Sequence, residues 1–266
     1  MPEGDSVWRL SERLQPLVGR TIEDSQFRVP QLATATLSGS TITRVWPHGK
    51  HLFWRCDERI LHTHLRMDGS WSVVGPGKSL PRQLDPDIRV LLAAERGPTA
   101  YGLSVPVVEM VMTTHEHELI GHLGPDPLRD DWDQAVAVAR LRAQPDLTIA
   151  AALLDQRLMA GLGNLWVNEL CFLRGVSPWT PVRDVDLDPL VRLAARALRH
   201  SAKVPGAYQV TTGNNRRGQD HWVAGRAHQP CRRCGTVVRV ADEVPGDPGQ
   251  RRTWWCPTCQ PGPSPD

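Results

Sequence analysis

The chain has 266 residues, 40% of them hydrophobic and 23% charged, which excludes a disordered protein and leaves room for one large or two ordinary domains. Its formal charge is only +2, and this near-neutral total argues at first against a polyanionic partner. The 31 basic residues include only 3 lysines, a bias toward arginine, whose side chain grips phosphate with two hydrogen bonds.

The N-terminal twenty residues carry six charged side chains, which excludes the apolar core of a secretory signal. No run approaches the roughly 18 apolar residues that a membrane helix needs. We therefore expect a cytoplasmic protein that does not cross a membrane.

Residues 5–18 place Val7, Leu10 and Leu14 at helical spacing, which predicts an amphipathic helix. Residues 21–112 differ in composition: short runs of β-branched and aromatic residues are separated by Gly and Pro. Such runs predict short strands. They lie at 42–46, 52–54, 60–65, 70–74, 88–94 and 107–112, with a turn at 47–49. Short, regularly spaced strands are typical of an antiparallel sandwich or barrel.

The second half of the chain is predicted to be mainly helical. Residues 121–127 contain two prolines and two glycines, as a linker would. Asp146 and Thr148 are candidate caps for the second of the helices that follow. Helical periodicity covers 133–143, 148–158, 163–173 and 186–202, whereas 261–266 is expected to be a disordered tail.

The strongest chemical signal is a pair of C-x-x-C units separated by 21 residues: Cys231, Cys234, Cys256 and Cys259. Two such units on successive strands supply four thiolates to one zinc ion, and four sulfur ligands make the site structural rather than catalytic. Residues 246–249 are the expected hairpin turn between them. The alternative is four unrelated buried cysteines. Cys56 and Cys171 stand outside the pattern.

Basic residues gather around these cysteines. Residues 200–260 hold nine basic and four acidic side chains, a net charge of +5, whereas residues 1–140 hold 15 basic and 18 acidic, a net charge of −3. The small total charge therefore hides a polarised molecule. A basic ribbon with Trp254 and Trp255 beside Arg251 suits contact with a nucleic-acid backbone, although a solvated surface would look similar.

Gly161-Leu162-Gly163-Asn164 lies between two predicted helices. A glycine-rich turn before a helix lets a phosphate approach main-chain N–H groups at the positive helix end. The alternative is an ordinary corner with glycine caps.

Met1-Pro2-Glu3-Gly4 opens the chain. Removal of Met1 would leave Pro2 with a free secondary amine, and an α-amino group titrates near 7.7–8.0, well below a lysine. Such an amine attacks a sugar C1′ or an aldehyde, and Glu3 beside it is placed to exchange a proton. The alternative is that Pro and Glu are simply favoured in a first helical turn.

Together, Pro2-Glu3-Gly4, the strand-rich first half, the Gly161–Asn164 turn and the cysteine ribbon with Arg251 resemble the formamidopyrimidine-DNA glycosylase / endonuclease VIII family of base-excision repair enzymes. The motifs occur in the family's order over residues 2–260. Gly4 after Glu3 is closer to the endonuclease VIII branch than to the formamidopyrimidine branch.

The resemblance implies an α+β fold: an antiparallel β-sandwich with an N-terminal helix, a helix–two-turn–helix domain and a C-terminal zinc ribbon. We expect a catalytic β-sandwich domain at 1–123, the helical domain at 124–224, the zinc-ribbon finger at 225–262 and a tail at 263–266.

It also implies roles for single residues. Pro2 corresponds to the nucleophile and Glu3 to the acid/base residue beside it. Lys50 matches the family's hairpin lysine, which contacts the phosphate next to the lesion. Asn164 and Arg251 match residues that hold the DNA backbone. Met67 lies where the family inserts a side chain into the space left by a flipped base; the alternative for Met67 is core packing.

At positions 5 and 6 the family usually has Pro-Glu, and this chain has Asp5 and Ser6, which puts a lesion contact there in doubt.

The expected activity is that of a bifunctional DNA glycosylase and AP lyase with one structural zinc ion. It would remove oxidised bases through an N-terminal proline Schiff base and cut the strand by β,δ-elimination. The resemblance to the endonuclease VIII branch implies that these bases are oxidised pyrimidines. We expect a monomer that binds damaged DNA, at the nucleoid if the source is bacterial. The alternative from another class is a zinc-ribbon DNA-binding protein without catalysis.

Overall fold

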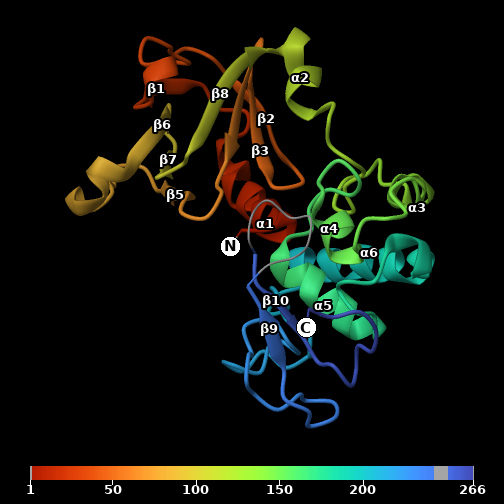
Figure 1. The fold of residues 1–266 in the computed structure, drawn as a ribbon. Helices are drawn as coiled ribbons and strands as arrows, with labels where there is room; N and C mark the ends of the chain where they lie inside the picture. The colour runs from red at the N-terminus through yellow and green to blue at the C-terminus, as the bar shows by residue number, and fades with distance from the viewer. Residues whose placement is uncertain (1, 243–250, 266) are drawn as a thin grey trace. The chain divides into compact units, whose positions relative to one another are not determined.

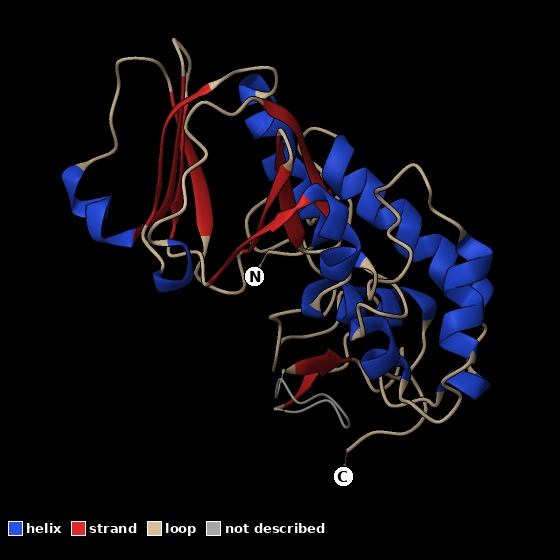
Figure 2. Cartoon of the chain, turned by 90° about the horizontal axis from the view of Figure 1, so that it is seen from above, coloured by secondary structure: helices blue, strands red, loops and turns tan. Residues whose placement is uncertain are grey.

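The structure is a computed structural model that describes residues 2–242 and 251–265. The hairpin turn expected at 246–249 lies outside these residues. The chain divides into two compact units, Met1–His122 and Leu123–Asp266. The α+β fold class is confirmed, with strands concentrated in the first unit and helices in the second (Figures 1 and 2).

The first unit is an antiparallel sandwich of two four-stranded sheets, with strand orders β1-β6-β7-β5 and β2-β3-β4-β8. The strands are β1 (Ile22–Phe27), β2 (Ile42–His48), β3 (His51–Cys56), β4 (Arg59–His64), β5 (Ser70–Val74), β6 (Ile88–Ala94), β7 (Thr99–Leu103) and β8 (Val107–Met112). Strands predicted at 70–74, 88–94 and 107–112 have the predicted bounds, whereas β1 and β7 were not predicted individually.

Helix α1 (Gly4–Leu14) is amphipathic as predicted, but it ends four residues early and continues as the 3-10 turn Gln15–Leu17, with Pro16 inside that turn. Val7, Leu10 and Leu14 are buried with side chains from both sheets, so helix and sheets share one core. In Figure 1 this helix lies against β2 and β3. This packing fixes the start of the chain on the sandwich.

The outer face of the second sheet has a smaller apolar cluster, in which Trp46, Phe53 and Ile60 are covered by the short helix α2 (Glu116–Ile120). Three further 3-10 turns, Pro30–Leu32, Arg82–Asp87 and Thr113–His115, complete the unit.

The second unit contains α3 (Gln134–Arg142), α4 (Ile149–Leu154), α5 (Asn164–Arg174) and α6 (Leu187–Lys203), with the 3-10 turn Val182–Asp184 before α6. A two-stranded ribbon follows, β9 (Arg239–Ala241) paired with β10 (Thr253–Trp255), and β10 lies against α5. Thr148 caps α4 as predicted, by accepting a hydrogen bond from the Ala151 N–H, whereas Asp146 forms an ion pair with Arg183.

One sequence-based expectation was wrong in this unit. Helix α4 ends at Leu154 rather than near 158, because Asp155 adopts an extended conformation and its carboxylate binds Arg157. Within the segment expected to be a disordered tail, the Pro263 carbonyl accepts a hydrogen bond from the Ser177 hydroxyl.

Candidate active site and nucleic-acid interface

Pro2 and Glu3 immediately precede the first turn of α1. Glu3 is the N-cap of the helix, has an extended backbone and is 1% exposed, while Pro2 is half-buried. The Ser6 hydroxyl accepts a hydrogen bond from the Glu3 N–H at 3.2 Å, as part of a capping box. Ser6 therefore has a local structural role, and the buried Glu3 carboxyl is held next to the proline ring in the chain.

Lys50 lies at the tip of the β2–β3 hairpin, whose last paired residues are His48 and His51. The turn predicted at 47–49 begins two residues too early, since Pro47 and His48 still pair with β3. A hairpin tip places an ammonium group at a sheet end, where a ligand can reach it.

A chain of hydrogen bonds runs through histidines beside this hairpin. His51 Nδ1 lies 2.8 Å from His62 Nε2, and His62 Nδ1 lies 2.9 Å from a Glu109 carboxylate oxygen. Because a carboxylate only accepts, His62 donates from Nδ1, so its Nε2 accepts from His51. His51 is thereby fixed with its proton on Nδ1. His62 is buried, and its two partners lie in the neighbouring strands β3 and β8, which no local sequence pattern indicates.

These histidines are neutral at neutral pH. Burial, with smaller contributions from neighbouring histidines, lowers the pKa of His51 to about 2. Burial and then the charge of Lys50 lower the pKa of His64 to about 4. At neutral pH His51 and His64 therefore add no positive charge to that of Lys50 and Arg66 at this end of the sheet.

Met67 is in the tight turn between β4 and β5. The Gly69 N–H donates to the Leu65 carbonyl at 2.9 Å, and the Arg66 N–H donates to His64 Nδ1 at 3.0 Å. The Met67 side chain is 64% exposed, so the alternative of core packing is wrong. An exposed apolar side chain on an anchored turn is suited to insertion between bases.

Asn164 is the first residue of α5. The turn before it contains Gly161 at φ +98°, a conformation that favours glycine, and the Gln156 side chain bonds Gly161 N–H and the Leu162 carbonyl. Gly163 is the extended N-cap. The Asn164 amide donates to the Arg252 carbonyl at 2.8 Å, so the helix start is tied to the ribbon beside Arg251.

The four predicted cysteine ligands converge: Sγ atoms of Cys231, Cys234, Cys256 and Cys259 all lie within 4.8 Å of one another. The Cys231–Cys259 and Cys234–Cys256 Sγ pairs are 3.9 and 3.4 Å apart. A tetrahedral ion with about 2.3 Å bonds to sulfur requires sulfur atoms about 3.8 Å apart. The cluster is therefore a candidate metal centre, and the alternative of four unrelated cysteines is wrong.

The other two cysteines are buried, and burial raises the pKa of both Cys56 and Cys171 to about 12. A thiol with such a pKa is neither a nucleophile nor a metal ligand at neutral pH. These two residues pack in the cores of their units.

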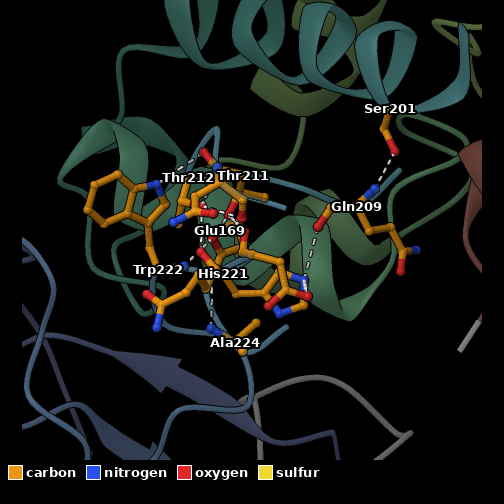
Figure 3. A network of polar contacts seen from close by, with 12 residues as sticks. Glu169, Ser201, Gln209, Thr211, Thr212, His221, Trp222 and Ala224 are labelled. Carbon is orange, nitrogen blue, oxygen red and sulfur yellow. Dashed lines mark hydrogen bonds and ion pairs between the residues drawn. The ribbon is translucent and has the colours of Figure 1, made fainter. Parts of the chain in front are cut away.

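Glu169, which sequence reasoning missed, is fully buried in α5 and organises the loop before the ribbon (Figure 3). Its carboxylate accepts hydrogen bonds from the Trp222, Val223 and Ala224 N–H groups at 2.8–2.9 Å and from the Thr211 hydroxyl. The available signal was an Asn-Glu pair on an otherwise apolar stretch of predicted helix, 165–173.

In the described part of the chain, no helix is both long enough and apolar enough to cross a membrane.

Comparison with protein families gives two matches. The model of the formamidopyrimidine-DNA glycosylase N-terminal domain matches residues 1–101, and that of the formamidopyrimidine-DNA glycosylase H2TH domain matches residues 123–202. The two models together cover most of both units.

Comparison with individual proteins gives matches along the whole chain. It is 48% identical to "Probable endonuclease 8 2" of Streptomyces coelicolor, covering 100% of this chain and 96% of the relative. It is 41% identical to "DNA-(apurinic or apyrimidinic site) lyase Nei2" of Mycolicibacterium smegmatis, covering 98% and 99%. Among solved structures, MutM in complex with DNA containing carbocyclic 8-oxo-G matches with a TM-score of 0.78 at 24% identity, over 98% of this chain and 100% of that one.

Proposed function

The chain belongs to the formamidopyrimidine-DNA glycosylase family, and from this premise we propose that it is a DNA glycosylase with AP lyase activity that acts in base-excision repair through the amine of Pro2. The relatives named as endonuclease 8 and as an AP lyase support this activity. The observation that carries the proposal is the Pro2–Glu3 pair at the start of α1, with Glu3 buried at the N-cap.

In the proposed reaction, removal of Met1 exposes the Pro2 amine, which attacks the sugar C1′. The bond from C1′ to the base breaks, the base leaves with a proton, and Glu3 is the group in place to exchange protons with the sugar and the base. The product is an iminium between Pro2 and C1′, with the sugar ring opened.

The iminium makes the C2′ proton acidic. Loss of that proton expels the 3′ phosphate by cleavage of the C3′–O bond, and a second elimination expels the 5′ phosphate. Water then hydrolyses the link to Pro2 and restores the amine. We propose both eliminations, β and δ, from the resemblance to the endonuclease VIII branch.

A base inside a duplex cannot be reached by this amine, so the damaged nucleotide must first be flipped out at a cost of a few kcal/mol. We propose that Met67 fills the space that the base leaves. Its 64% exposure on an anchored turn supports this role.

Three groups are proposed to hold the phosphate backbone: Lys50 at the hairpin tip, Asn164 at the positive end of α5, and Arg251 before β10. The net charge of +5 over residues 200–260 supports a polyanionic ligand at the ribbon.

We propose that Cys231, Cys234, Cys256 and Cys259 hold one zinc ion, since the sulfur separations suit tetrahedral coordination by four thiolates. A closed tetrahedral zinc site stabilises the ribbon and takes no part in bond cleavage. The proposed enzyme is a monomer that prefers oxidised pyrimidines and works in the cytoplasm, where chromosomal DNA is found in a bacterium.

The test is borohydride trapping on duplexes that carry an abasic site, thymine glycol, 5-hydroxycytosine or 8-oxoguanine. Wild type should form a covalent adduct, with the oxidised pyrimidines ahead of 8-oxoguanine, and Pro2→Gly should lose it. If Pro2→Gly is trapped as well as wild type, Pro2 is not the nucleophile.

Mass spectrometry of the purified protein supplies an independent check. The proposal requires Pro2 as an unmodified first residue. A retained or acetylated Met1, together with tight binding of abasic DNA and no trapped adduct, would identify a DNA-binding protein without catalysis instead.

A further inference from the structure

A second asparagine lies one helical turn after Asn164 and does not belong to any motif recognised in the sequence. Asn168 is 2% exposed, in the middle of α5. Asparagine is a poor residue for a helix interior, because its amide competes for backbone hydrogen bonds. A buried asparagine at this position therefore calls for specific partners.

Asn168 has partners on both sides. Its Nδ2 donates to the Asn164 carbonyl at 2.6 Å and approaches the Asn164 side-chain oxygen at 3.3 Å. Its Oδ1 accepts from the Trp254 N–H in β10 at 2.8 Å. The orientation of the amide is fixed, because a flipped amide would face a carbonyl with its oxygen and an N–H with its nitrogen.

Asn164 and Asn168 thus attach α5 to the ribbon at two backbone points, the Arg252 carbonyl and the Trp254 N–H. These points flank Thr253, which is 1% exposed, and the segment they fix begins directly after Arg251. The same two side chains are joined to each other. The start of α5 and the Arg251 segment therefore form one hydrogen-bonded unit.

We propose that Asn168 is a positioning residue for DNA binding: buried away from solvent, it fixes the spacing between Asn164 and Arg251 so that both meet the phosphate backbone together. This inference rests on the proposed function, which assigns Asn164 and Arg251 to DNA contacts. Fixing the two groups beforehand removes the ordering cost that binding would otherwise carry.

The position requires a donor and an acceptor on one short side chain. Asn168→Leu has similar volume and neither group. Asn168→Asp keeps an acceptor for the Trp254 N–H but has no proton for Asn164. Asn168→Leu therefore removes the hydrogen bonds to both Asn164 and Trp254, whereas Asn168→Asp removes only those to Asn164.

The experiment measures binding to a duplex that carries a tetrahydrofuran abasic analogue, by fluorescence anisotropy from 0.05 to 0.4 M KCl. The slope of log K against log [KCl] is negative, and it becomes less steep by about 0.9 for each phosphate that the protein no longer neutralises. If a variant and the wild type bind equally at 1 M salt, the loss of one such phosphate contact weakens binding by about eightfold at 0.1 M. Arg251→Ala should show this change.

Asn168→Leu should make the slope less steep by the same amount. The double variant with Arg251→Ala should bind the duplex no more weakly than Arg251→Ala alone. Asn168→Asp should lie between Asn168→Leu and wild type. Each protein must contain one zinc ion per chain. If Asn168→Leu does not retain zinc, Asn168→Asp with and without Arg251→Ala gives the same comparison.

The role of Asn168 is overturned if its variants weaken binding with an unchanged slope, or if their effects add fully to that of Arg251→Ala. A wild-type protein that does not prefer the tetrahydrofuran duplex over an intact one, or an Arg251→Ala slope equal to wild type, overturns the proposed DNA contacts and this inference with them.

Discussion

Replacing Glu169 by glutamine should loosen the loop before the ribbon while leaving the shape of the side chain unchanged. The carboxylate is 0% exposed; one oxygen accepts from the Val223 and Ala224 N–H groups, and the other from the Trp222 N–H and the Thr211 hydroxyl. An amide nitrogen cannot accept, so at least one backbone N–H loses its partner.

The magnitude follows from these hydrogen bonds. The least costly orientation directs the new nitrogen toward Trp222 and Thr211, because the hydroxyl can turn and accept. One buried unpaired N–H costs about 1–3 kcal/mol, and the two remaining bonds lose the benefit of a charged acceptor. The lower cost of burying a neutral group offsets part of this. We expect a net decrease in the free energy of unfolding of about 2–3 kcal/mol.

The assay is urea unfolding of the zinc-loaded protein, with amide hydrogen exchange to locate the effect. The amides of 222–224 should exchange much faster in Glu169→Gln than in wild type, and those of β6 should not change. Thr211→Val, which removes only the hydroxyl, is the matched control and should cost less. Stability within about 0.5 kcal/mol of wild type, with residues 222–224 still protected, would refute the reasoning.

Three further predictions concern other parts of the molecule. In the unfolded chain His51 and His64 bind protons with pKa values near 6.5, whereas in the folded protein their pKa values are about 2 and about 4. Because the unfolded state therefore binds more protons, the free energy of unfolding should fall as the pH drops from 6.5 toward 4, by about 1.4 kcal/mol per pH unit per histidine. Urea midpoints between pH 7.5 and 4.5 test this, and a flat profile contradicts it. Cys234→Ser should lose the metal, measured as zinc per chain, and weaken DNA binding; Cys171→Ser should keep it. Met67→Ala should change stability by less than about 0.5 kcal/mol, because the side chain is exposed, yet slow trapping on a paired lesion more than on a single-stranded abasic site; equal slowing on both substrates would count against a wedge.

The sequence was most informative where a regular pattern determines local structure. β5, β6 and β8 alternate or concentrate apolar residues, and their bounds were predicted correctly. β1 reads Ile-Glu-Asp-Ser-Gln-Phe and has mostly polar residues, since much of it faces solvent, while β7 contains Gly102. Neither has a strand pattern of its own; each is held in place by pairing with β6.

The candidate site divides in the same way. The cysteine spacing predicted a cluster because metal ligands repeat at a short local distance. Asn168 and Glu169 depend on partners 86 and about 50 residues away, and no local rule connects such positions. The histidine chain from His51 to Glu109 likewise depends on the register of three strands, which the sequence does not state.

The ribbon has little interior of its own. Its apolar cluster contains Phe172 from α5, stacked on Trp222 with ring centroids 5.4 Å apart, and the Arg233 guanidinium lies 4.2 Å from the Phe172 ring centre. A metal bound by the four cysteines is therefore thermodynamically linked to the end of a helix that contributes no ligand. A peptide that begins at residue 225 would lack both Phe172 and Trp222. The ribbon therefore cannot be transferred to another protein as an autonomous module unless α5 is transferred with it.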